Sequence, residues 1–164
     1  SLFLKTSDLI ADNNTVLFSN NRNEFFSLDV KNGAIRWKQK INSNLRSTLI
    51  ENTIISITNE GYLVLTDNRT GNIIRINYVF SELKPKKLIK ALSKPEIIKI
   101  KPVGFIVGSK NVYLTTDNGK LLVIDVKEGK VISILKIDNE KISRPFVLNQ
   151  SLFIIKNNSI IKLD

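Results

Sequence analysis

Hydrophobic residues in this chain gather in short runs, each bounded by Gly, Asn, Asp or Pro. Representative runs are TVLFS from Thr15, YLVLT from Tyr62 and KLLVI from Lys120. β-Branched and aromatic residues dominate these runs, and no segment sustains the helical period of about 3.6 residues. The pattern therefore predicts short β-strands joined by tight turns, and it argues against a helical solenoid.

One phrase recurs three times and sets the register of the strands. In each copy an Asp is followed four residues later by a Gly, and another strand-like run begins after that Gly. An Asp side chain accepts hydrogen bonds from backbone N–H groups ahead of it, and Gly adopts positive φ without steric cost. We therefore predict structural turns at all three copies. The pairs are Asp29 and Gly33, Asp67 and Gly71, and Asp125 and Gly129.

A second marker lies six residues before each of these Asp residues and before Asp164. The marker is Gly or Asn in every copy, the two residues that best tolerate positive φ in a hairpin turn. The four markers are Asn23, Gly61, Gly119 and Asn158. Successive Asp residues lie 38, 58 and 39 positions apart, so one step carries an insertion of about 20 residues.

Each repeat contains four strand-like runs, and a unit of about 40 residues is typical of a propeller blade. We predict an all-β protein: a β-propeller of four-stranded antiparallel blades, with about four blades in this chain. Residues 1–164 are expected to form a single propeller domain or a propeller fragment. The fourth unit reaches only its third strand at Asp164, so we expect its last strand to come from residues 2–5 or from a partner chain.

The turn phrases resemble the repeats of PQQ-like β-propellers, in which a Trp follows the turn Gly by four residues. The phrases are SLDVKNGAIRW, LTDNRTGNIIR and VIDVKEGKVIS, and the resemblance covers nearly the whole chain outside residues 81–101. Trp37 holds the Trp position in the first unit, whereas Arg75 and Ser133 hold it in the next two. The resemblance implies that Trp37 packs between blades. It also points to the non-catalytic, BamB-like branch of the family, and hence to the periplasm or cell envelope.

Residue usage limits the chemistry that the chain can perform. Cys and His are both absent, which excludes thiolate catalysis, a Ser-His-Asp triad and the usual zinc sites. The three turn Asp residues recur at one repeat position, so a structural role explains all of them. The segments DNRTGN from Asp67 and TDNGK from Thr116 lack the ligand spacing of a calcium loop. We therefore expect no catalytic residue, no cofactor and no metal ion.

The chain is basic, with a formal net charge of +10. Its lysines are spread over turns and strands, whereas a nucleic-acid footprint gathers basic residues on one face. No apolar run approaches the roughly 20 residues of a membrane helix. Met is absent, so we interpret the chain as a processed product or as an excised piece of a longer protein.

Residues 81–101 are the one stretch that the repeat does not explain. Within them Leu88, Ile89 and Leu92 lie between two prolines, where they would line one side of a short helix. This basic inter-blade insertion is a candidate partner-binding loop or anionic-surface contact, and a solvated insertion without a role is the alternative. The candidate partner-binding residues are Lys84, Lys86, Lys87, Leu88, Lys90 and Lys94.

The sequence is interpreted as that of a non-catalytic scaffold or protein-interaction module, with a protein partner that the sequence does not identify. The four blades are expected either to close into a ring as a monomer or to pair with a second copy of the chain, which would complete a larger ring of about eight blades. Two alternatives stay open. A fragment of a PQQ-dependent dehydrogenase would bind PQQ or calcium tightly, although the vicinal Cys pair of those enzymes is absent. A propeller that binds nucleic acid or an anionic surface would show steeply salt-dependent affinity.

Overall fold

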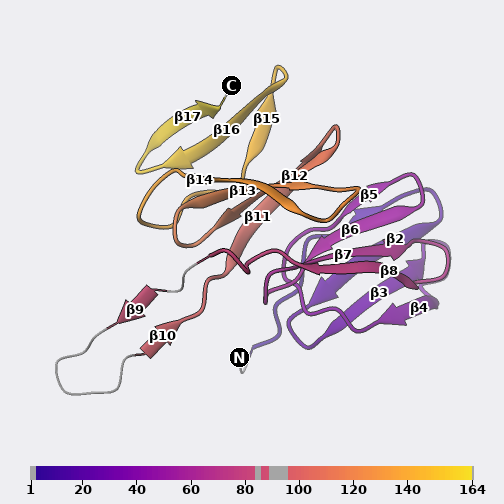
Figure 1. Cartoon of the computed structure of the whole chain (residues 1–164). Coiled ribbons are helices and arrows are strands. Elements are labelled where there is room, and N and C mark those ends of the chain that lie inside the picture. Colours follow the sequence, from indigo (N-terminus) through magenta and orange to yellow (C-terminus); the bar gives the residue numbers. More distant parts are fainter. Residues whose placement is uncertain (1–2, 84–85, 89–95, 164) are drawn as a thin grey trace.

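The computed structural model describes residues 3–83, 86–88 and 96–163, and that part of the chain contains strands and turns without a helix. Most strands gather in four antiparallel sheets, each built from strands that follow one another in the chain (Figure 1). The prediction of an all-β propeller with about four blades is confirmed. We number the sheets as blades 1 to 4 in chain order.

Blades 1 and 2 are four-stranded meanders. Blade 1 consists of β1 (Ile10–Ala11), β2 (Thr15–Asn20), β3 (Glu24–Asp29) and β4 (Ile35–Gln39). Blade 2 consists of β5 (Thr48–Ile50), β6 (Thr53–Ile57), β7 (Tyr62–Asp67) and β8 (Ile73–Tyr78). The first strand of each blade lies at one edge of its sheet and the fourth strand lies at the other.

Blade 3 repeats this arrangement, whereas blade 4 has three strands in the described part of the chain. Blade 3 consists of β11 (Pro102–Gly108), β12 (Asn111–Thr116), β13 (Lys120–Asp125) and β14 (Val131–Lys136). Blade 4 consists of β15 (Phe146–Leu148), β16 (Ser151–Lys156) and β17 (Ser159–Leu163).

The same irregularity recurs in the three four-stranded blades. The pairing of the third strand with the fourth skips one residue just before each turn Asp, and this β-bulge bends and twists the fourth strand. The shifts lie between Ser27 and Leu28, between Leu65 and Thr66, and between Val123 and Ile124. The internal repeat therefore extends from the turn residues to the detailed strand register.

The core lies between the blades rather than within any one of them. Val64 on β7 packs toward blade 1 with Trp37, whereas its neighbours Leu63 and Leu65 pack toward blade 3. Both faces of the inner strands are thus buried, which accounts for their nearly continuous hydrophobic runs. A smaller cluster joins blade 3 to blade 4 through Leu121, Ile142 and Ile154.

The insertion forms a two-stranded hairpin where it is described. β9 (Lys86–Leu88) pairs with β10 (Glu96–Ile98), and Figure 1 shows this pair projecting away from the blades. The helix that the sequence suggested here is therefore wrong for Lys86–Leu88, because cross-strand pairing satisfies their backbone groups instead. The other residues expected to act in this segment, Lys84, Lys90, Lys94, Ile89 and Leu92, lie outside the described residues.

The N-terminal segment lies against blade 1. The backbone N–H of Asn21 donates to the carbonyl of Lys5 at 3.0 Å, and its side-chain amide donates to the carbonyl of Phe3 at 2.9 Å. In the described part of the chain, residues 3–5 do not complete blade 4 as predicted, because these bonds hold them to blade 1. In the described part of the chain β17 is an edge strand of blade 4, and a strand from a partner chain stays a prediction.

Candidate functional site

The three Asp–Gly turns share one geometry. In each turn the Gly N–H donates to the Asp carbonyl at 2.8 Å, and the Gly φ values are 70°, 74° and 69°. Asp67 shows what the carboxylate does, because its Oδ1 accepts the backbone N–H groups of Arg69 at 2.9 Å and of Thr70 at 2.8 Å. The hydrogen bond from the Thr70 backbone is the main cause that holds the pKa of Asp67 below its ordinary value.

The other two turn carboxylates also bind the backbone of their own turns. Asp29 accepts the N–H of Lys31 at 2.9 Å, and Asp125 accepts the N–H of Glu128 at 2.6 Å. Within the described residues, no group of three or more His, Cys, Asp or Glu is placed to hold a metal ion. The same part of the chain contains no helix long and apolar enough to cross a membrane. The geometry gives these carboxylates a structural task.

The hairpin markers show why Gly stands at two of them. All four markers adopt positive φ. Phe80 lies directly against Gly61, and the backbone carbonyl of Asp138 lies directly against Gly119, so a Cβ would clash at both positions. Positive φ and a close neighbouring group therefore both favour Gly over any other residue at these two hairpins.

Trp37 joins blade 1 to blade 2. Its indole Nε1–H donates to the backbone carbonyl of Asn68 at 2.8 Å, within the Asp–Gly turn of blade 2. Its ring lies against Gly71, where an added Cβ would come within 2.6 Å of the ring. Gln39 adds a second bond from its Nε2–H to the carbonyl of Gly71 at 2.9 Å. These two hydrogen bonds join the fourth strand of blade 1 to the turn of blade 2, and we call this junction the latch.

Arg75 makes the same connection between blades 2 and 3. Its guanidinium donates to the backbone carbonyls of Val126 and Lys127 in the Asp–Gly turn of blade 3, and Asn77 contacts Gly129 in that turn. Sequence reasoning missed this role, because it treated Arg75 only as a departure from the Trp of the repeat. The available signal was the repeat position itself, since Trp37 and Arg75 share it and both carry N–H donors.

The corresponding turn of blade 1 is uncovered. Among the described residues, no atom lies within 4 Å of the place where a Cβ on Gly33 would stand, whereas Gly71 and Gly129 are covered by the preceding blade. Val30 and Ile35 beside this turn are exposed. Blade 1 therefore presents the acceptor half of a blade junction without a donor strand against it.

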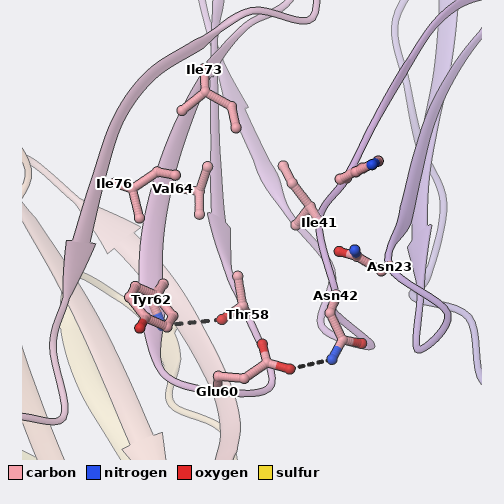
Figure 2. Close-up of a pocket in the computed structure, with 10 residues that line it drawn as sticks. Asn23, Ile41, Asn42, Thr58, Glu60, Tyr62, Val64, Ile73 and Ile76 are labelled. Carbon is pink, nitrogen blue, oxygen red and sulfur yellow. Dashed lines mark hydrogen bonds between the residues drawn. The ribbon is translucent and has the colours of Figure 1, made fainter.

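A groove of about 450 Å³ runs between blade 1 and the outer part of blade 2 (Figure 2). At one end the amide of Asn42 donates to the carboxylate of Glu60, and the N–H of Tyr62 donates to the hydroxyl of Thr58 at 3.1 Å. The apolar lining is formed by Ile41, Val64, Ile73 and Ile76. The groove suits apolar side chains, with hydrogen-bonding groups at one end.

Strand β8 has an apolar outer surface that the outer strand of blade 1 lacks. Ile74, Ile76 and Tyr78 are 58%, 51% and 50% exposed, and the rings of Tyr62 and Tyr78 lie with centroids 5.0 Å apart. At the same repeat positions, blade 1 has Arg36, Lys38 and Lys40. An exposed group of apolar side chains of this kind is a candidate interaction site. We call Tyr62, Ile74, Ile76 and Tyr78 the β8 surface.

Comparison with known proteins agrees with this architecture. A PQQ family model described as outer membrane protein assembly factor BamB matches residues 3–77. The solved structure of BamB from Moraxella catarrhalis is similar to this chain with a TM-score of 0.69 at 13% identity. That match covers 95% of this chain and 41% of the BamB chain, so this chain spans less than half of that protein. A comparison with curated protein sequences found no match.

Two computationally designed proteins are also similar. The Ika4 structure gives a TM-score of 0.69 at 10% identity, and the match covers 96% of this chain and 89% of Ika4. The Ika8 structure gives 0.68 at 11% identity, covering 96% of this chain and 44% of Ika8. These likenesses show a β-propeller fold, and the family match over residues 3–77 supports PQQ-like repeats in that part of the chain. The predicted resemblance to PQQ-like repeats is confirmed at the level of the repeat.

Proposed function

We propose that this chain is a non-catalytic propeller scaffold that binds another protein through the β8 surface. The observation that carries the proposal is the exposure of Ile74, Ile76 and Tyr78 on one strand, where blade 1 has basic residues. Covering apolar surface contributes roughly 25 cal/mol for each Å² removed from water. Burial of these three side chains against a partner therefore supplies a large part of a binding free energy.

The position of β8 favours an extended partner segment. Among the described strands β8 pairs with β7 alone and lies at the edge of its sheet, so its outward backbone N–H and C=O groups can accept an added strand. Ile76 and Tyr78 pair with Val64 and Tyr62 and lie on one side of the strand, and Ile74 lies at the β-bulge next to them. A partner strand with apolar residues at alternate positions would pair with the backbone and cover these side chains together. The adjoining groove accommodates the bulkier partner residues.

The uncovered turn of blade 1 supports a second interface of the scaffold. The two covered turns each accept the outer strand of the preceding blade, and we infer that the Asp29–Gly33 turn accepts a PQQ-like blade in the same way. The expected source is a second copy of this chain, completing a larger ring. Sedimentation equilibrium is expected to show a dimer that Gly33→Trp dissociates. A strict monomer whose scattering fits a closed four-bladed ring would contradict this interface.

The likeness to BamB supports a location in the periplasm or cell envelope as part of the same proposal. Fractionation of cells that produce the protein tests it, and recovery with cytoplasmic markers would contradict it. The dehydrogenase alternative is tested by calorimetric titration of the purified chain with PQQ and calcium. A scaffold gives no saturable heat in that titration, whereas stoichiometric binding of PQQ would replace the proposal with an enzymatic one.

Photo-crosslinking tests the β8 surface directly. A photoreactive phenylalanine analogue placed at Ile76 in producing cells is expected to give a discrete crosslinked band. The matched control carries the analogue at Lys38, the same repeat position in blade 1. The band must also weaken several-fold when Ile74→Lys is added, because that substitution gives blade 2 the basic character of blade 1. Equal crosslinking from both positions, or no effect of Ile74→Lys, would overturn the proposal.

A further inference from the structure

Two lysines of different blades are held by the same pair of backbone bonds. The N–H of Lys5 donates to Asn21 Oδ1 at 2.8 Å, and the carbonyl of Lys5 accepts the N–H of Asn21 at 3.0 Å. Lys101 repeats both bonds with Asp117, at 2.9 Å and 3.0 Å. The segment that leads into blade 1 and the segment that leads into blade 3 are therefore tied to their sheets at the same point.

A third lysine holds the same place in blade 4. Two residues after Lys141, the N–H of Ser143 donates to the carbonyl of Ile155 at 3.0 Å, and its hydroxyl accepts the N–H of Ile155 at 2.8 Å. In blade 1, Ser7 follows Lys5 at the same interval and makes the same pair of bonds with its facing strand. The repeat therefore places one lysine at an equivalent point in each of three blades.

The three lysines line one cavity of about 490 Å³. The other residues that line it are Asn21, Asn42, Asn44, Leu45, Asn59 and Pro102. The described lining contains no acidic side chain, and in the described part of the chain none of the three ammonium groups has a hydrogen bond or an ion pair. The positive charges of the three lysines repel one another. An anion bound among them would attract all three and offset that repulsion.

Several of the polar side chains near the cavity are already engaged with one another or with the backbone. The amide of Asn59 donates to Asn42 Oδ1 at 3.0 Å, and the amide of Asn42 donates to the carboxylate of Glu60. Asp117 holds the backbone of Lys101 with its own carboxylate. Glu60 and Asp117 reduce the local positive potential, but neither lines the cavity. Three lysines therefore belong to the described walls of the cavity, and no acidic residue does.

We propose that this cavity binds a small multivalent anion of the phosphate class. Several negative charges match three lysines, and charge-assisted hydrogen bonds from ammonium groups to phosphate oxygens are short and strong. The walls come from segments that lead into all four blades, so the space suits a compact ligand in solution. Because the anion contacts several blades of the folded protein, its binding also raises the unfolding temperature as its concentration rises.

Calorimetric titration with inorganic pyrophosphate tests the proposal. The native chain is expected to bind one pyrophosphate per chain, with an affinity that falls as salt is added. Each of Lys5→Gln, Lys101→Gln and Lys141→Gln is expected to weaken binding about threefold, and the triple variant about thirtyfold. Thermal unfolding gives a second reading, because pyrophosphate stabilises the native chain and not the triple variant. Circular dichroism confirms that the triple variant is folded, and the single variants decide the outcome if it is not.

The matched control removes the same charge elsewhere. Lys31, Lys110 and Lys127 are exposed and lie in turns at the opposite ends of their strands, so their triple Gln variant has the same net charge as the first. This control variant is expected to bind pyrophosphate with nearly native affinity. Equal weakening in both triple variants would mean that only net charge matters, and would overturn the proposal. Absence of saturable binding by the native chain would overturn it as well.

Discussion

Replacing Trp37 with Ala removes the latch between blades 1 and 2. The indole is 8% exposed, contacts the Phe25 ring edge-on with centroids 5.5 Å apart, and donates to the carbonyl of Asn68 at 2.8 Å. Substitutions of a buried Trp by Ala destabilise by about 3–5 kcal/mol. About 1 kcal/mol of that loss belongs to the hydrogen bond. We therefore expect Trp37→Phe to cost about 1–2 kcal/mol and Trp37→Ala about 4 kcal/mol.

Urea unfolding followed by circular dichroism measures these losses. With a dependence of about 2 kcal/mol per molar urea, Trp37→Ala lowers the midpoint by about 2 M. Trp37 is the single Trp of the chain, so its fluorescence reports the blade 1–2 junction in the native protein. Coincidence of the fluorescence and dichroism transitions checks that the blades unfold together, as the free-energy comparison requires.

The control for this prediction is Ile35→Ala on the same strand. Ile35 is 61% exposed, so its truncation is expected to change the free energy of unfolding by less than about 0.5 kcal/mol. If Trp37→Ala shifted the midpoint no further than Ile35→Ala, the junction would not depend on the indole. The assignment of the core to the spaces between blades would then be wrong at this junction.

Four further predictions follow from the same contacts. Gly71→Ala is expected to destabilise more than Gly33→Ala in urea, because both positions have positive φ but only the Cβ at Gly71 meets an indole ring; equal losses would refute the latch. Arg75→Ala should cost about 2 kcal/mol in the same assay, with partial recovery in Arg75→Lys, whose single ammonium replaces a fork of donors. Deletion of residues 84–94 with a short Gly/Ser link should preserve the circular dichroism spectrum, since halving a loop changes its closure free energy by about 0.6 kcal/mol; an unfolded product would place the segment in the core. Acid should destabilise the chain as pH falls below 3.8, the ordinary Asp pKa, because the lowered pKa of Asp67 means that the unfolded chain takes up the proton first; Asp67→Asn is expected to remove part of this loss, and an unchanged acid profile would contradict it.

The strands and turns of this protein are determined by local sequence. An Asp that accepts N–H groups two or three residues ahead, and a Gly with positive φ, specify each Asp–Gly turn from within a few residues. β-Branched runs between those turns leave strands as the favoured state. Repetition at 38 and 39 residues, with one longer step of 58, then indicates blades, and a propeller buries both faces of such strands. The fold was therefore predictable without any tertiary information.

The surfaces were decided only by the tertiary structure. Arg75 reaches a carbonyl 51 residues further along the chain, and no local pattern shows which turn faces a side chain over that separation. The β8 surface depends on which side of an outer strand the neighbouring blade leaves open. Phe3 and Lys5 join blade 1 because Asn21 binds them, although position in the repeat suggested blade 4. Lys5, Lys101 and Lys141 share one cavity only after the blades are arranged about it. Local hydrogen bonding sets each blade, whereas exposure and charge at a surface depend on how separate blades meet.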